Sequence, residues 1–185
     1  TIFTISEPYQ LPCSQLIRML IPPTFLEING MRFLITGMPR DFELSEFEKL
    51  YKSYNVTDVV RTCEECHYSD EFLKSLNIES HVFVFADGSI PPDDVVKQFV
   101  DLCDSRFGPE SKNPKATISI HCKAGLGRAP ALVTIALIEH GMSNIDAIQT
   151  VKKYRQEAFN QKQLLALTRY EPLCKKHAKG CCVIT

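Results

Sequence analysis

The residues best suited to chemistry lie in the segment HCKAGLGR, which begins at His121 and ends at Arg128. Cys122 supplies a nucleophilic sulfur, and Arg128 a planar guanidinium that binds two phosphate oxygens at once, as lysine cannot. Gly125 and Gly127 let the backbone curl until successive N–H groups converge on one point. Those amides, Arg128 and nearby His121 should all favour the thiolate of Cys122 over the thiol. The segment therefore predicts a phosphate-binding site with a reactive sulfur.

The flanking segments place this turn at the start of a helix. Residues 116–121 alternate small or polar residues with isoleucine, as a strand does, and residues 129–140 are apolar nearly all round, which indicates a buried helix. The first N–H groups of a helix lack internal partners and its dipole is positive there, so an anion is favoured. The predicted phosphate-binding residues are Lys123, Ala124, Gly125, Leu126, Gly127 and Arg128.

Two other interpretations of the turn carry less weight. A structural cysteine beside an ordinary loop would be the better assumption for an isolated Cys, but here cysteine, glycines and arginine coincide in a strand–turn–helix context. A nucleotide-binding loop is excluded because no Gly-Lys-Ser/Thr follows to hold the β- and γ-phosphates and magnesium.

A thiolate that attacks a phosphomonoester needs a proton for the departing oxygen, and a carboxylic acid on a nearby loop can supply it. Asp87 is the best candidate because it follows an apolar run and precedes Gly88. The alternative is a turn aspartate that bonds its own backbone. Asn160 and Gln163 are candidates for orienting water or the catalytic loop, and helix capping is the alternative role of Asn160.

Composition limits the classes of protein that fit. A chain of 185 residues, 44% of them apolar, is sufficient for one α/β domain with a full core. The net charge of −1 and the lack of a basic stripe argue against nucleic-acid binding. Eight cysteines in a chain of this size are expected to be reduced cytosolic thiols rather than a disulfide scaffold. Cys63 and Cys66 form a CxxC, but no second ligand pair for zinc is evident, so we expect no metal and no cofactor.

Predicted strands and helices alternate along the chain, which implies a mainly parallel sheet of about five strands flanked by helices. A hairpin is predicted to turn at Asn29-Gly30, and a strand over residues 81–85 to be buried on both faces. Gly141 is the expected cap of the core helix. The remaining helices are predicted over residues 43–54, 70–76, 91–107, 143–157 and from 160 to Pro172. Ligands in such sheets bind beyond the carboxyl ends of the strands, where loops 62–68, 86–91, 122–128 and 158–163 could converge.

The segment HCKAGLGRAP resembles the signature loop of cysteine-dependent protein phosphatases, and its Ala-Pro resembles the phosphatase of regenerating liver family, the type IVA protein tyrosine phosphatases. Other segments resemble the family in the same order: MRFLITGMP, VVRTCE, FADG, ALIEHGM and AFNQKQLL. The resemblance covers about residues 24–185. It implies a cysteine phosphatase fold, with an N-terminal extension (1–24), a phosphatase domain (25–171) and a C-terminal tail (172–185).

The resemblance implies a slow phosphatase acting on phosphotyrosine-type protein phosphomonoesters through a phosphocysteine. Cys122, Arg128 and Asp87 match the family's catalytic residues, and Cys63 the cysteine able to form a disulfide with the nucleophile, followed by the acidic Glu64. Phosphoinositides are alternative substrates. An alternative function is a low-activity binding module that captures a magnesium transporter of the cyclin-M type.

Ala129, which resembles the family, and two departures from the family pattern lie near the site. Ala129 stands where related dual-specificity phosphatases place Ser or Thr, whose hydroxyl can bond the thiolate as phosphocysteine hydrolyses; alanine cannot, so slow turnover is expected. Residues 83–86 replace a Trp-Pro pair and a second aspartate, and one residue is inserted before Pro91. Lys123 replaces an apolar residue and either attracts phosphoinositides or points to water.

The last four residues, Cys182-Val183-Ile184-Thr185, form a C-a-a-X box, which predicts prenylation of Cys182. A single prenyl chain binds membranes marginally, and palmitoylation of Cys181 is a candidate second signal. The alternative is a tail with unmodified thiols. Prenylated protein is expected at the cytoplasmic face of plasma or endosomal membranes, and unmodified protein in the cytoplasm; association into homo-oligomers stays open.

Overall fold

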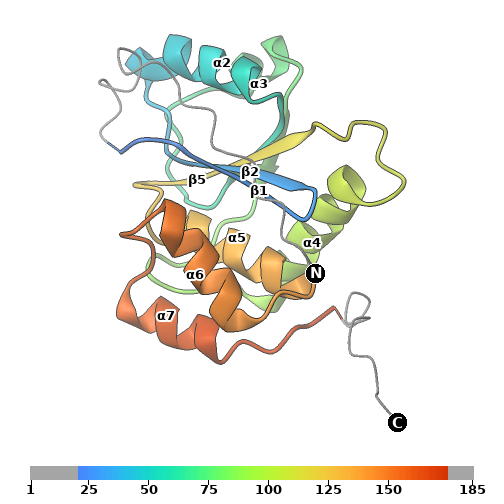
Figure 1. The fold of residues 1–185 in the computed structure, drawn as a ribbon. Helices are drawn as coiled ribbons and strands as arrows, with labels where there is room; N and C mark the ends of the chain where they lie inside the picture. Colours follow the sequence, from blue (N-terminus) through green and yellow to red (C-terminus); the bar gives the residue numbers. More distant parts are fainter. Residues whose placement is uncertain (1–20, 175–185) are drawn as a thin grey trace.

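A five-stranded sheet in the order β1-β2-β5-β3-β4 runs through the middle of the molecule (Figure 1). This computed structural model describes residues 21–174. The strands are β1 (Thr24–Ile28), β2 (Met31–Gly37), β3 (Val56–Arg61), β4 (Glu79–Val82) and β5 (Thr117–Cys122). Only β1 runs antiparallel to its neighbour. The predicted mainly parallel sheet of about five strands is confirmed.

The sheet separates two groups of helices, with α2 and α3 on one side and α4, α5, α6 and α7 on the other (Figure 1). The helical elements are the 3-10 turn η1 (Asp41–Glu43), α2 (Leu44–Ser53), α3 (Asp70–Ser75), α4 (Asp93–Phe107), α5 (Arg128–Glu139), α6 (Asn144–Tyr154) and α7 (Gln161–Thr168). Among residues 21–174, none of these helices has the length and apolar character needed to span a membrane.

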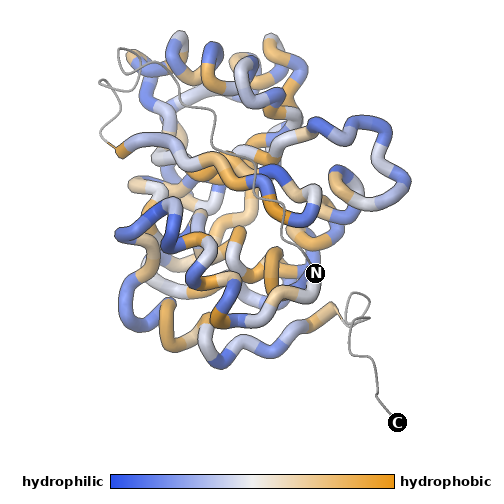
Figure 2. Tube along the Cα trace, viewed as in Figure 1, coloured by the Kyte–Doolittle hydropathy of each residue, from blue (hydrophilic) through white to orange (hydrophobic). Residues whose placement is uncertain are grey.

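Two hydrophobic cores lie on opposite faces of the sheet because successive side chains of a strand alternate. In β2, Phe33 and Ile35 pack in the core that includes α4 and α5, whereas Leu34 packs in the core that includes α2. Apolar residues are concentrated where the central strands meet α5 (Figure 2). Every residue of α5 is buried, as its all-round apolar sequence predicted.

The position of β5 decides where the functional loops meet. It lies between β2 and β3, is buried along its whole length, and pairs Cys122 with Gly37 and His121 with Arg61. The carboxyl ends of three parallel strands therefore lie at one edge of the sheet. The hairpin at Asn29-Gly30 is also confirmed, since both residues have the positive φ, 52° and 82°, that a two-residue turn favours.

The prediction for the fourth strand is wrong. β4 ends at Val82 and forms the edge of the sheet, with Val82 54% exposed, instead of a strand over residues 81–85 that is buried on both faces. Phe83 and Phe85 are buried nonetheless, because the chain after β4 packs against α4. The Phe83 ring lies 6.3 Å from that of Phe99 in this helix. The apolar run signalled a packed connection rather than a longer strand.

Two helix ends differ from the prediction. α6 ends at Tyr154, three residues before Glu157, because Arg155 leaves the helical conformation (φ −137°, ψ 79°). α7 ends at Thr168, before Pro172 is reached. The predicted glycine cap of α5 is confirmed: Gly141 follows His140 with φ 92°, and the amides of Gly141 and Met142 bond back to the carbonyl oxygens of Ile138 and Leu137.

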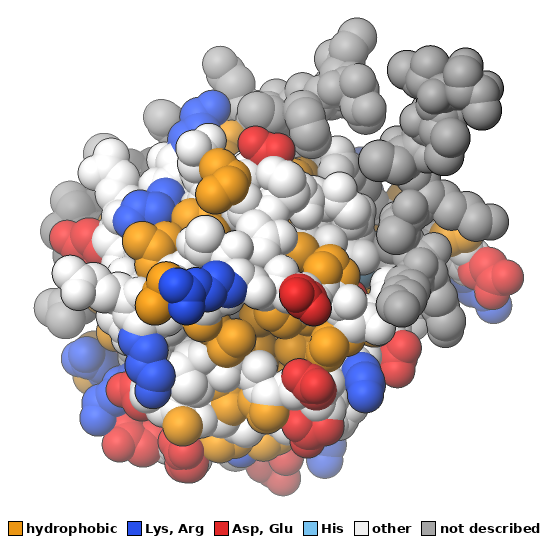
Figure 3. Space-filling model, turned by 90° about the horizontal axis from the view of Figure 1, so that it is seen from below, with side chains coloured by type: hydrophobic (Ala, Val, Ile, Leu, Met, Phe, Trp, Pro, Cys, Tyr) orange, Lys and Arg blue, Asp and Glu red, His pale blue; other side chains and the backbone are white. Residues whose placement is uncertain are grey.

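The outer surface of α6 and α7, seen from below in Figure 3, mixes charged side chains of both signs with apolar ones. Ile145 of α6 and Leu165 of α7 are each 52% exposed. This face is thus an amphipathic surface without one dominant charge. The predicted lipid-modified residues, Cys181 and Cys182, lie outside the described residues, as do residues 1–20 of the predicted extension.

Candidate active site

Cys122 ends β5, and the phosphate loop, residues 123–128, leads from it into α5. Cys122 is only 4% exposed, and its Sγ accepts a hydrogen bond of 3.2 Å from the amide of Gly125. An N–H group that points at the sulfur stabilises negative charge there. The loop therefore has the predicted form, in which a backbone amide and a helix N-terminus face the candidate nucleophile.

Gly125 is the residue that this close approach depends on. Its φ is 71°, and a Cβ at this position would lie 2.4 Å from the carbonyl oxygen of Thr36 and 2.7 Å from Nη2 of Arg155. Neither the conformation nor the space suits a side chain. Glycine thus lets the phosphate loop press against the end of β2.

Arg128 is the first residue of α5, and its guanidinium is held from three directions. Nη1 donates to the carbonyl oxygens of Thr62 and Phe85, both at 3.3 Å, and to the carboxylate of Glu64 at 3.4 Å. These contacts come from the loops after β3 and β4, which fixes the guanidinium beside the phosphate loop. Arg128 is buried, so the fork is preorganised rather than mobile.

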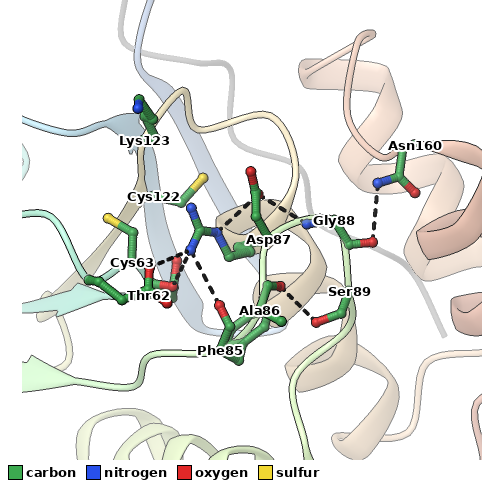
Figure 4. Close-up of polar contacts among 12 residues, drawn as sticks. Thr62, Cys63, Phe85, Ala86, Asp87, Gly88, Ser89, Cys122, Lys123 and Asn160 are labelled. Carbon is green, nitrogen blue, oxygen red and sulfur yellow. Dashed lines mark hydrogen bonds and ion pairs between the residues drawn. The ribbon is translucent and has the colours of Figure 1, made fainter.

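Asp87 lies beside Arg128 on the loop after β4 (Figure 4). Its Oδ1 is 3.2 Å from Nε of Arg128, and 81% of its side chain is exposed. The same oxygen accepts a hydrogen bond of 3.0 Å from the amide of Gly88. Asp87 is therefore a turn aspartate, and its carboxyl group also lies beside Arg128 at the end of the phosphate loop; its role as proton donor stays a prediction.

Asn160 and Gln163, at the start of α7, hold the loop that carries Asp87. Asn160 Nδ2 donates to the carbonyl oxygen of Gly88 at 3.2 Å, and Gln163 Nε2 donates to that of Ser89 at 2.8 Å (Figure 4 shows the first of these bonds). The two residues also cap the helix reciprocally through their amide groups. Capping and loop fixation thus occur together, since the cap leaves one N–H₂ group of each residue free for the loop.

His121 is buried beside Tyr68. Burial, with the nearby positive charge of Arg61, lowers its pKa from 6.5 to about 3. Its Nε2 lies 2.7 Å from the hydroxyl of Tyr68. The imidazole is therefore neutral near pH 7, so it offers no positive charge to the thiolate, and its predicted support of the nucleophile stays a prediction.

Cys63 and Cys122 lie next to one another at the ends of β3 and β5 (Figure 4). Burial raises the pKa of Cys63 to about 11, opposed by the charge of Arg128, so its sulfur stays a thiol. Cys66, the other member of the CxxC, is exposed. Glu64, between them, reaches back to Arg128. The site thus holds two neighbouring sulfurs, one buried thiol and one at the head of the phosphate loop.

Lys123, which differs from the family pattern, and Ala129, which differs from related dual-specificity phosphatases, have very different exposure. Lys123 points to solvent, and its Nζ lies 3.2 Å from a carboxylate oxygen of Glu65, which partly neutralises it. Ala129 is fully buried in the first turn of α5. The ammonium group of Lys123 is therefore ion-paired at the rim of the site. The hydroxyl that Ala129 lacks would lie in its interior.

One group of possible metal ligands exists among the described residues, consisting of Asp58, Glu79 and His81. Arg106 already occupies this group, since it donates to both oxygens of Asp58 at 2.8 and 2.9 Å and to Glu79 at 2.6 Å. A guanidinium repels a metal ion, so this cluster at the edge of the sheet is suited to an ion-pair network.

Arg155 is a site residue that the sequence did not predict, and its Nε donates to the carbonyl oxygen of Gly125 at 2.6 Å. In the sequence it follows Lys152 and Lys153 at the end of a helix, a pattern typical of a solvated basic face. One signal for its position was available in the sequence. Arg155 lies three residues before the loop at 158–163, which was predicted to meet the phosphate loop.

Known protein phosphatases resemble this chain. The family model described as "Swiss Army Knife protein, DSP-PTPase phosphatase domain" matches residues 30–179. The PRL-1 phosphatase of Drosophila melanogaster is 38% identical over 159 residues, 85% of this chain and 88% of that protein. A probable protein tyrosine phosphatase type IVA A of Dictyostelium discoideum is 41% identical over 150 residues, 81% of this chain and 88% of that protein.

A solved structure of a putative protein tyrosine phosphatase from Leishmania major superposes with a TM-score of 0.71 at 32% identity. The match covers 82% of this chain and 99% of that chain. The predicted cysteine phosphatase fold is confirmed.

The buried state of His121 predicts a pH dependence of stability. Because its pKa is lower in the folded chain than in the unfolded chain, its contribution is complete above pH 6.5 and is lost as the pH falls toward 3. We expect the free energy of unfolding in urea to fall by about 1 to 2 kcal/mol between pH 6.5 and pH 5 through this residue. The variant His121→Gln should show a flatter profile; equal slopes for the two proteins would contradict the neutral state of His121.

Proposed function

The chain belongs to the phosphatase of regenerating liver family of protein tyrosine phosphatases, and on this premise we propose that it hydrolyses protein phosphotyrosine-type esters slowly through a phosphocysteine at Cys122. The observation that carries the proposal is that the Gly125 amide donates to the sulfur at the end of β5, while the carbonyl oxygens of Thr62 and Phe85 hold the Arg128 guanidinium at the end of the same loop. A sulfur nucleophile with preorganised donors for a transferring phosphoryl group is the machinery of covalent phosphoryl transfer.

In the first proposed step, the thiolate of Cys122 attacks phosphorus and the bond to the substrate oxygen breaks. The departing oxygen takes a proton from Asp87, which stands beside Arg128 at the entrance to the loop. Loop amides and the guanidinium hold the phosphoryl oxygens. Asn160 and Gln163 keep the Asp87 loop in place, so that little reorganisation accompanies proton transfer.

In the second proposed step, water attacks the phosphocysteine and the thiolate of Cys122 leaves. Asp87 accepts the proton from water, reversing its first role. No hydroxyl is present at Ala129 to bond the leaving thiolate, and that residue is buried, so water does not readily take its place. The second step is therefore the slow one.

Protein substrates are favoured over phosphoinositides by the state of Lys123. Its charge is partly neutralised by Glu65 at 3.2 Å, so it contributes little to a second phosphate site at the rim. The alternative function, capture of an acidic loop such as that of a cyclin-M type transporter, uses the same cradle, since its donors bind a carboxylate as well as a phosphate. The alternative differs from catalysis by forming no phosphoenzyme.

Rapid mixing with para-nitrophenyl phosphate tests the proposal. We expect a burst of about one product molecule per site, followed by slow turnover, because the phosphocysteine accumulates. Cys122→Ser should abolish the burst, and Cys66→Ser, which removes an exposed cysteine of the same region, should leave it intact. Wild-type protein without a burst, but with tight binding of an acidic peptide, would instead support the binding module.

Ala129→Ser tests which step is slow. A hydroxyl bond to the thiolate is worth roughly 1.5 to 3 kcal/mol, so steady-state kcat should rise by about ten- to a hundred-fold. The rate of the burst should change little, because the substitution acts on the second step. If kcat stays constant and the burst rate changes, the loop after β4 limits the reaction instead.

The neighbouring sulfurs predict a redox response. Mild peroxide should oxidise Cys122 to a sulfenic acid, which the thiol of Cys63 converts to a disulfide with loss of water, and a dithiol reductant should restore activity. Peptide mapping should find Cys63 joined to Cys122, and Cys63→Ser should lose reversible protection. A bond between Cys63 and Cys66 would show that the CxxC is the redox pair.

A further inference from the structure

Arg155 is a buried cation beneath the phosphate loop, with 5% of its surface exposed. Besides the bond from Nε to Gly125, its Nη1 donates to Oγ1 of Thr24 at 2.7 Å and to the carbonyl oxygen of Pro22 at 3.0 Å. Nη2 is buried and has no hydrogen-bond partner within residues 21–174. One side chain thus joins the end of α6, the start of β1 and the phosphate loop.

Within residues 21–174, all the hydrogen-bond acceptors of Arg155 are neutral oxygens. A buried guanidinium remains charged, because arginine is not deprotonated in proteins, and it is costly unless an anion lies near it. Burial lowers the pKa of Arg155, and the negative charge of Cys122 opposes that change. The available counter-charge is therefore the sulfur of the nucleophile.

Other charged and titratable groups lie on the elements that surround the phosphate loop. They are His121 in β5, Cys63 and Glu64 after β3, Asp87 after β4, and Arg128 in α5. His121 is neutral and Cys63 protonated, while Glu64 and Asp87 both lie against Arg128 and offset its charge. Arg155 carries a positive charge that no carboxylate contact offsets among the hydrogen bonds described.

The bond to Gly125 also orients the loop. In a planar trans peptide the C=O and N–H groups point in opposite directions, so holding the Gly125 carbonyl turns the N–H of Leu126 away from Arg155. The amide of Gly125 itself bonds the Cys122 sulfur. Arg155 thus lies on one side of the phosphate loop, and the N–H groups of Gly125 and Leu126 point to the other side, where the sulfur of Cys122 lies.

We propose that Arg155 is a positioning residue, which holds the phosphate loop in its anion-binding conformation and supplies the second buried cation that keeps Cys122 as a thiolate. The proposal deepens the proposed function, since it concerns the same nucleophile. It does not require turnover, because the reactivity of the sulfur and the binding of phosphate can each be measured without it.

The test compares Arg155→Gln and Arg155→Lys with wild type by the pH dependence of Cys122 alkylation by iodoacetamide, followed by peptide mapping. Removing the charge in Arg155→Gln should raise the midpoint by about one pH unit, and Arg155→Lys should restore most of that shift. Lys153→Gln removes an exposed cation from the same helix and should leave the midpoint unchanged, because solvent screens it.

Arg155→Lys also separates charge from geometry, because an ammonium group cannot reproduce the fork to Gly125 and Thr24. We expect inorganic phosphate, measured by its protection of Cys122 from alkylation, to bind several-fold more weakly to Arg155→Lys.

An unchanged midpoint in folded Arg155→Gln, or wild-type phosphate binding in Arg155→Lys, overturns the proposal. If Arg155→Gln does not fold, Arg155→Lys decides alone, and a midpoint raised by a full unit despite the retained charge counts against the electrostatic role. A different result is that wild-type protein shows no burst with para-nitrophenyl phosphate while the three proteins show the expected alkylation midpoints. That result would reject the proposed function and leave this inference standing.

Discussion

The burial of a nucleophilic sulfur, that of Cys122 at the end of a strand buried along its whole length, is the constraint on which the site depends. A thiolate in such surroundings is unfavourable unless donors and positive charges replace water. The Gly125 amide, the start of α5 and the Arg128 guanidinium supply them on one side, and Arg155 lies on the other. Gly125 and Arg128 belong to one loop, whereas Arg155 follows α6, so the fold must bring these two parts of the chain together.

The sheet order explains how this is achieved. Because β5 is central, the loops after β2, β3 and β4 can all reach its carboxyl end, and each contributes backbone contacts rather than only side chains. The carbonyl oxygens of Thr62 and Phe85 orient Arg128, and that of Thr36 limits the space at Gly125. Backbone contacts fix positions with little loss of side-chain entropy, which suits a site that must be ready before the substrate binds.

Local patterns allowed much of this to be predicted. The phosphate loop and α5 follow from glycines, an arginine and an apolar helix, and the hairpin follows from Asn29-Gly30, because these signals act within a few residues. The edge position of β4, the neutral state of His121 and the buried position of Arg155 could not be predicted in this way. They depend on which elements pack together: Val82 is exposed because no strand lies beyond it, His121 is desolvated by the core, and Arg155 leaves a basic helix end to turn inward.

The central claim is that phosphoryl transfer proceeds through the sulfur of Cys122. Rapid acid quenching during the burst, followed by mass mapping of the peptides, tests this most directly. The account predicts one added phosphoryl group, carried by the peptide that contains Cys122 and absent before substrate is added. A phosphoryl group on another peptide, or product released in a burst with every peptide unmodified, would contradict it.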